Sequence, residues 1–456
     1  MRIKRPLDIL VAATALVFLT SSFDIFLTVN LGPTIRVAQL IVLLLLAATL
    51  LSHRMGLTME VPLGGQYLLA WWCVQLAFAP VAEFWQKSFA YVMWLGLNIA
   101  LTFALVNLFT RKRGQIDTLL RLYLFSYVFV AFFGVLQFVL PVIGGPSLLV
   151  QQWWLPGRLP RASGFSYEPS YYATYLIMGI VALGSLRRSG VTEFRSRNWT
   201  FGYLLMIIAM VLSSSRMGIV FLILELAITP MRRMWKILKA PQLLLSIRVS
   251  GRRVVVAAIL LCCTYIAIRE AVNWVSENLQ AVVFLANGTG LLGTSSLSVD
   301  DRGDHFKDTM HIIVDHPLIG RSLGGITESV AAYSGVTPHT FEEAKDYEGQ
   351  AVFAEVVAAS GLLGAIPFFC FVAVTIAAPL RLANRTSPIQ AAWLRALVLA
   401  LAFEWAILQF NQNILRLYLW VHIALLATVF AAVRRPSAER SESHSGTEFP
   451  STNLLS

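Results

Sequence analysis

The chain is dominated by apolar runs that are long enough to cross a membrane. About 20 predominantly apolar residues form a helix that spans the hydrocarbon core of a bilayer, and such runs recur along nearly the whole chain. We therefore predict an all-α polytopic membrane protein with about twelve transmembrane helices. Pro367 lies inside the long tenth run, where we expect a kink. The predicted spans lie at about residues 7–29, 35–51, 62–79, 88–109, 118–140, 170–186, 199–213, 216–230, 253–269, 350–379, 391–410 and 414–432.

The N-terminal run has a basic flank followed by apolar residues, a pattern that a secretory signal peptide shares. The apolar stretch continues to Val29, and no clear small-residue cleavage site follows it. We therefore expect the first span to be a membrane anchor.

Two long segments between the spans, residues 141–169 and 270–349, form larger loops on the predicted outer face. Within the second loop, helical spacing from Asp304 to Asp315 predicts an amphipathic helix on the membrane surface or across the mouth of the bundle. Its apolar face consists of Phe306, Met310, Ile313 and Val314. The sequence GRSLGG, residues 320–325, is expected to be a flexible turn. Residues 1–433 thus form one membrane domain, and the polar, Ser-rich residues 434–456 are expected to be a disordered cytoplasmic tail.

Composition and charge support a membrane protein and argue against a nucleic-acid partner. Of the 456 residues, 57% are hydrophobic and 13% are charged, whereas a soluble chain carries roughly a quarter charged residues. The formal net charge is +11, but the basic residues form short clusters between apolar runs. Lys and Arg are roughly twice as frequent in the alternate segments that include both termini, which predicts cytoplasmic termini by the positive-inside rule.

The first outer loop ends in RASGFSYEPSYYATYL, which begins at Arg161. Pro169 suits the first turn of a helix, so the sixth span is expected to begin at the outer face. Glu168 is then either a helix cap or an anion favoured by the positive end of the helix dipole.

The seventh and eighth spans are joined by the short turn SSSRMG, residues 213–218. Serines are ordinary in such a turn, but an arginine at the start of a membrane helix opposes the helix dipole. Arg216 therefore either extends to lipid headgroups or faces an anionic partner within the bundle.

Three predicted helices begin at the outer face near residues 169, 216 and 350, and each presents backbone N–H groups there. Four arginines lie in the adjoining loops, namely Arg158, Arg161, Arg302 and Arg321. Because guanidinium groups and helix starts both bind phosphate, the sequence predicts a composite site for a multiply charged anion such as a pyrophosphate.

The sequence does not predict a metal ion or another cofactor. His305, His311 and Asp301 or Asp304 could be imagined as ligands, but they lack a tight metal-binding motif. The cysteines have no CxxC spacing and are expected to be packing residues; they are Cys73, Cys262, Cys263 and Cys370.

Four stretches of the chain resemble the Wzy/WaaL superfamily, which contains O-antigen and exopolysaccharide polymerases together with O-antigen ligases. They are the segment from Arg161, the SSSRMG turn, RGDHFKDTMHIIVDHPLIGRSLGG from Arg302, and EGQAVFAEVVAASGLLG from Glu348. With the late large outer loop and the twelve-span layout, the resemblance extends over most of residues 90–430.

The resemblance implies transfer of a glycan from an undecaprenyl-diphosphate carrier to an acceptor hydroxyl, at the outer face of a bacterial inner membrane. It implies that Arg302 and Arg216 bind the diphosphate and that Arg161 is the basic residue of the first outer loop; we expect Arg321 to assist. The expected partners are the lipid-linked glycan, membrane lipids, a chain-length regulator and a flippase.

Ligases of this superfamily typically have His-Asn where this chain has Gln350-Ala351. This departure removes the expected base of a ligase and favours a polymerase of lipid-linked repeat units. Its catalytic residues would be Arg302 and a carboxylate that serves as general base, Glu168 or Glu348. An O-antigen ligase is the first alternative. A polysaccharide or lipid-carrier transporter is the second, because Glu225 and Glu404 lie in the middle of predicted spans.

Overall fold

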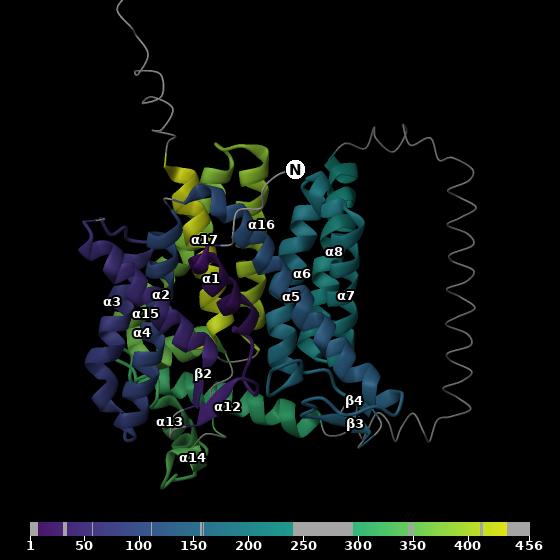
Figure 1. Ribbon diagram of the computed structural model, residues 1–456. Helices are drawn as coiled ribbons and strands as arrows, with labels where there is room; N and C mark the ends of the chain where they lie inside the picture. The colour runs from purple at the N-terminus through teal and green to yellow at the C-terminus, as the bar shows by residue number, and fades with distance from the viewer. Residues whose placement is uncertain are drawn as a thin grey trace, which may run out of the picture.

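The computed structural model describes residues 8–30, 34–56, 58–110, 112–155, 157, 159–239, 295–344, 347, 351–410 and 414–435. Within these ranges the protein is a bundle of long helices with two short antiparallel hairpins (Figure 1). Six of the described helices are long and apolar enough to cross a membrane. The prediction of an all-α polytopic membrane protein is therefore confirmed, and the count of twelve spans stays a prediction.

Every predicted span that falls within the described residues contains a helix, whereas the ninth, 253–269, lies outside them. The helices are α1 Ile9–Thr20, α2 Val37–Arg54, α3 Gly65–Phe78, α4 Trp85–Phe109, α5 Arg113–Val142, α6 Pro169–Arg188, α7 Arg197–Ser213, α8 Arg216–Lys239, α15 Val352–Ala383, α16 Pro388–Ile407 and α17 Leu417–Arg434. Two short 3-10 helices, η1 Ala79–Val81 and η2 Thr192–Arg195, lie between them.

The most buried helices lie at the centre of the bundle. Most side chains of α6 and α17 are buried; α6 packs against α16 and α7, and α17 packs against α4. Figure 1 shows α6, α7 and α8 on one flank and α2, α3, α4 and α15 on the other.

The two hairpins and the helices of the second predicted outer loop gather at one end of the bundle, which we call the loop end (Figure 1). The hairpins consist of β1 Thr28–Asn30 with β2 Thr34–Arg36 and of β3 Trp153–Leu155 with β4 Leu159–Pro160. The loop helices are α12 Ser295–Asp315, α13 Ile326–Tyr333 and α14 Phe341–Ala344. The termini of the described chain lie toward the opposite end.

The predicted amphipathic helix is present as α12, but a different face of it is packed. Ile312 is fully buried in a small core with α13 and α15, and Thr309 is buried beside it. Phe306, Met310 and Val314 of the predicted apolar face remain exposed. The helix thus lies across the loop end with apolar side chains still accessible, as expected for a helix at a membrane surface.

Helix α15 is broken, but at Gly361 and not at Pro367. Gly361 has φ 54° and ψ −163°, a conformation that is essentially restricted to glycine. The backbone groups that the break releases pair with the segment that follows α12. Arg321 N–H donates to the carbonyl of Ala358 at 2.9 Å, and Leu362 N–H donates to the carbonyl of Pro317 at 2.8 Å. The next residues repeat this pattern: Ser322 N–H donates to the carbonyl of Ala359, and Leu363 N–H donates to the carbonyl of Leu318.

The segment GRSLGG is tightly packed, so the expectation of a flexible turn is wrong. A side chain at Gly320 would contact the backbone of α15, and one at Gly324 would lie 2.5 Å from Ser88 Cα in α4. The hydroxyls of Ser88 and Ser322 also hydrogen-bond to each other. The glycines are needed because two helices approach the loop backbone closely.

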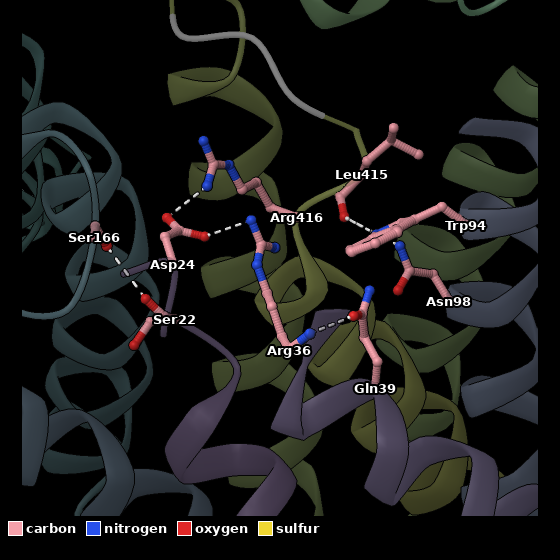
Figure 2. A network of polar contacts seen from close by, with 9 residues as sticks. All are labelled: Ser22, Asp24, Arg36, Gln39, Trp94, Asn98, Ser166, Leu415 and Arg416. Atoms are coloured by element: carbon pink, nitrogen blue, oxygen red, sulfur yellow. Dashed lines mark hydrogen bonds and ion pairs between the residues drawn. The ribbon is translucent and has the colours of Figure 1, made fainter. Parts of the chain in front are cut away.

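The first predicted span ends earlier than expected, and the segment after its helix contains Asp24, which belongs to a buried charge cluster. Helix α1 ends at Thr20, and the carboxylate of Asp24 lies between two arginines (Figure 2). Arg36 Nη2 lies 2.9 Å from Asp24 Oδ1, and Arg416 Nη1 lies 2.5 Å from Asp24 Oδ2. Removing one partner from such a buried pair leaves an uncompensated charge and typically costs roughly 3–5 kcal/mol.

Hydrogen bonds around this cluster join distant parts of the chain. Asp24 N–H donates to the carbonyl of Phe165 in the first outer loop at 2.9 Å. Trp94 and Asn98 of α4 both donate to the carbonyl of Leu415, at 3.3 and 3.1 Å (Figure 2). The start of α17, the first outer loop and α4 are therefore fixed relative to one another.

We predict that Gly361→Ala destabilises the protein strongly. The backbone strain alone costs about 1–3 kcal/mol, and the added Cβ would lie 2.2 Å from the carbonyl carbon of Leu318. Thermal unfolding of the purified protein, followed by size-exclusion chromatography in detergent, measures the effect. The matched control is Gly114→Ala, because Gly114 lies near the start of α5 with open space around its Cα. Equal thermal stability of the two variants would contradict the role of the break.

Candidate active site

A cavity of about 820 Å³ opens at the loop end among several elements that are distant in the sequence. It is bounded by the first outer loop, the start of α6, the turn between α7 and α8, α12, the start of α15 and the end of α16. Its lining residues are Gln152, Arg161, Glu168, Pro169, Ser170, Thr174, Ser214, Ser215, Arg216, Met217, Gly303, Phe306, Ala351, Ile407, Gln409 and Phe410. Three of the residues singled out from the sequence, Arg161, Glu168 and Arg216, thus share one cavity.

The first outer loop is held in place by buried contacts. The carboxamide oxygen of Gln137, in α5, accepts the N–H groups of Ser163 and Gly164 at 2.8 and 2.9 Å. The ring of Phe165 stacks between Phe23 and Phe133, with centroid distances of 4.0 and 4.1 Å. The motif RASGF therefore anchors the loop, and it leaves Arg161 at the edge of the cavity.

Glu168 lies at the N-cap position of α6, directly before Pro169. Its side chain does not cap the helix backbone. One carboxylate oxygen instead accepts the hydroxyl of Ser170 at 2.9 Å, and the side chain is exposed. The carboxylate is therefore accessible from the cavity.

Two serines of the SSSRMG turn, Ser214 and Ser215, have structural roles. Ser214 adopts the left-handed conformation, with φ 53°, and ends α7. The hydroxyl of Ser215 accepts the N–H group of Gly218 at 3.3 Å and so caps the start of α8. A Cβ at Gly218 would lie 2.7 Å from the Cβ of Ala173, so α8 packs closely against α6. This turn places Arg216 at the cavity.

Arg161 is positioned by hydrogen bonds to two cavity residues. Its Nη1 donates to Gln152 Oε1 at 2.9 Å, and its Nη2 donates to the carbonyl of Ser214 at 3.3 Å. Burial and the positive charge of Arg216 lower the pKa of Arg161, while the carboxylate of Glu168 opposes them. Two cations that repel each other in a partly buried cavity attract an anion there.

The start of α15 contributes less to anion binding than expected. Val352 N–H donates to the carbonyl of Leu408 at 3.2 Å, and Phe353 N–H donates to Gln409 Oε1 at 3.3 Å. These first-turn donors are therefore already used within the protein. Residues at the starts of α6 and α8 also line the cavity.

The remaining predicted site residues are distributed differently. Arg302 belongs to α12 directly before Gly303, which lines the cavity; its side chain lies outside the described part of the structure. Arg321 is not among the lining residues, and its Nε donates to Ser329 Oγ at 3.2 Å. Glu348, Gln350 and Arg158 lie outside the described residues.

Arg321 lies close to Glu328, which links α13 to the α3–α4 connection. The Glu328 carboxylate accepts the N–H groups of Glu83 and Phe84 at 2.8 and 3.1 Å. Burial raises the pKa of Glu328, while these bonds and the charge of Arg321 lower it. Arg321 therefore takes part in a loop-anchoring contact, and its role in diphosphate binding stays a prediction.

Several lining residues were not anticipated from the sequence. Gln152 and Gln409 supply amide groups, and Phe306 and Phe410 supply exposed aromatic faces. Amides and aromatic rings are the groups that typically contact sugar hydroxyls and C–H faces. A polar residue at the end of an apolar run, as at Gln409, was the available signal.

The other candidate polar groups lie away from the cavity or lack a metal-binding arrangement. Among the described residues, no group of three His, Cys, Asp or Glu side chains could hold a metal ion. Glu225 pairs with Arg188 at 2.5 Å. Glu404 is fully buried, and neither carboxylate oxygen has a hydrogen-bond partner among the described residues.

The fold and the site together define a multi-pass membrane protein with an arginine-lined cavity at one end of its helix bundle. Residues 201–369 match the family model Wzy_C, which is described as O-antigen ligase. The match confirms over these residues the resemblance to the Wzy/WaaL superfamily, and it supports a glycan-processing function of the polymerase or ligase type. Comparison with curated proteins gives no match.

Proposed function

We propose that this protein polymerises oligosaccharide repeat units that are linked to undecaprenyl diphosphate, at the outer face of a bacterial inner membrane. The matched family supports a glycan-processing enzyme of the polymerase or ligase type. Above all, Arg161 and Arg216 share a partly buried cavity with the carboxylate of Glu168. This combination suits a reaction that expels a diphosphate and removes a proton from a hydroxyl.

The proposed reaction is a displacement at the anomeric carbon of the growing chain. A hydroxyl of the acceptor repeat unit forms the new C–O bond, while the bond between the anomeric carbon and the diphosphate oxygen breaks. Undecaprenyl diphosphate leaves with the bonding electrons. Glu168 accepts the proton of the attacking hydroxyl as general base.

The arginines act on the charge that develops on the leaving group. Arg216 and Arg161 lie beside the helix starts that line the cavity, and Arg302 lies in α12, which crosses the loop end. Guanidinium groups bind phosphate oxygens through two parallel hydrogen bonds. Fixed donors of this kind stabilise a transition state without having to reorganise.

An O-antigen ligase is the second candidate, favoured by the description of the matched family. It would use the same donor chemistry with a lipid-core acceptor. Gene deletion separates the two: without a polymerase, single repeat units remain attached at the cell surface, whereas without a ligase, long chains accumulate unattached. Gel analysis of surface and lipid-linked polysaccharide measures this. The second result would contradict the polymerase.

We predict that Arg216→Ala slows chain extension by about 100-fold, the effect of losing one donor to a developing oxyanion. Arg216→Lys should retain part of the activity, because it keeps the charge but loses the paired donors. Extension of lipid-linked repeats by purified protein in detergent is the measurement. Arg54→Ala serves as control, since Arg54 is an exposed arginine at the end of α2. Unchanged extension by Arg216→Ala would rule out its role.

We predict that Glu168→Gln lowers kcat by about 10²–10⁴-fold, the usual contribution of a general base, with a much smaller effect on KM. Steady-state kinetics of the extension of lipid-linked repeats measures both constants. Glu193→Gln, at an exposed carboxylate of η2, is the control. If Glu348→Gln shows these effects and Glu168→Gln does not, the base is Glu348.

A further inference from the structure

A second cavity, of about 500 Å³, lies at the end of the bundle opposite the loop end. It is formed by the connection between α2 and α3 together with the last turn of α17. Glu60, Arg434 and Arg435 supply its charged groups, and Val61, Leu63 and Phe430 are among its apolar lining residues. The cavity thus has a charged part and an apolar part, and it lies beside the C-terminal end of α17.

The wall of this cavity is fixed by hydrogen bonds and close packing. Asn107 in α4 makes two hydrogen bonds to the backbone of Glu60. Its carboxamide oxygen accepts the Glu60 N–H group at 2.7 Å, and its Nδ2 donates to the Glu60 carbonyl at 2.9 Å. Gly64 adopts a positive φ of 70°, and a Cβ there would lie 2.8 Å from the ring of Phe371. The connection is therefore held firmly against α4 and α15.

The charged groups of the cavity favour an anion. Glu60 forms an ion pair with Arg435, and Arg434 adds a second guanidinium. Among the lining side chains, one positive charge is therefore in excess. Arginines at the end of a helix also complement its dipole, but that role alone requires neither a cavity nor an apolar wall.

We propose that this cavity binds the headgroup of an anionic glycerophospholipid. A phosphate diester with a single negative charge matches the excess charge of the arginines, and basic pockets between membrane helices are suited to such headgroups. The glycerol and the first acyl carbons would lie against Val61 and Phe430. A bound lipid joins the α2–α3 connection to α17, so it stabilises the folded protein by mass action.

Thermal unfolding of the purified full-length chain in a neutral detergent tests this site. The arms add dioleoylphosphatidylglycerol, dioleoylphosphatidylcholine or inorganic phosphate. We expect the anionic lipid to raise Tm by roughly 3 °C at a lipid concentration of about 100 Kd and the other two additions to have little effect. An equal rise with the zwitterionic lipid, or with phosphate alone, would overturn the proposal.

Two double variants locate the effect. Arg434→Gln with Arg435→Gln should abolish the rise in Tm, whereas Arg381→Gln with Arg385→Gln, at exposed arginines near the end of α15, should retain it. Equal responses of the two double variants would overturn the assignment to this cavity.

Glu60→Gln provides a test that does not remove the arginines. It eliminates the carboxylate that competes for Arg435, while the backbone contacts with Asn107 remain. The anionic lipid should therefore bind more tightly, with half-maximal stabilisation at a lower lipid fraction. A higher half-maximal lipid fraction than in the parent protein would contradict the proposal, even if the arginine variant did not fold.

Discussion

Backbone polar groups in the interior of a membrane protein must find partners within the protein, because hydrocarbon offers none. The break in α15 at Gly361 releases carbonyl and N–H groups, and the segment after α12 supplies the partners. The segment of the second predicted outer loop that follows α12 is thereby fixed to the helix that also begins at the cavity. Ile312 of α12 then packs in the same small core as Ala358 and Ala359. The position of α12 over the loop end follows from this pairing.

The buried cluster of Asp24 with Arg36 and Arg416 fixes the other side of the cavity. Arg416 lies over the ring of Tyr171, 3.8 Å from its centroid, in the first turn of α6. Through Phe165 the cluster also holds the first outer loop. The described parts of both loops that reach the cavity are therefore anchored by contacts within the protein. Such preorganisation is the condition under which fixed charges contribute most to catalysis.

The long helices could be predicted from the sequence because apolar runs report directly on membrane insertion. The location of the break in α15 could not be predicted. Pro367 is a strong local signal for a kink, whereas the break at Gly361 is explained only by the loop that packs against it. Asp24 was hidden in an apolar run, and its partner Arg416 is 392 residues away. Pairings over such distances depend on the tertiary fold, which single-sequence patterns do not contain.

The candidate site was more predictable, because helix direction constrains it. If alternate spans begin at the same face, then Glu168 and Arg216, which lie at the starts of α6 and α8, must lie at the same end of the bundle. Both residues line the cavity. Arg321 satisfied the same criterion but contacts Ser329. Gln152 and Gln409 are uncharged, so a search for charged residues did not find them. They nevertheless accept hydrogen bonds from Arg161 and from the first turn of α15. Charge patterns thus indicated three charged residues that line the cavity and missed the neutral residues beside them.

On the proposed mechanism, the repulsion between Arg161 and Arg216 has a catalytic consequence. The diphosphate that links carrier and sugar gains one negative charge when the bond to the anomeric carbon breaks. Two neighbouring guanidinium groups therefore stabilise the transition state and the departing diphosphate more than the intact substrate, which is the difference that accelerates a reaction. The same difference makes the product bind more tightly than the substrate.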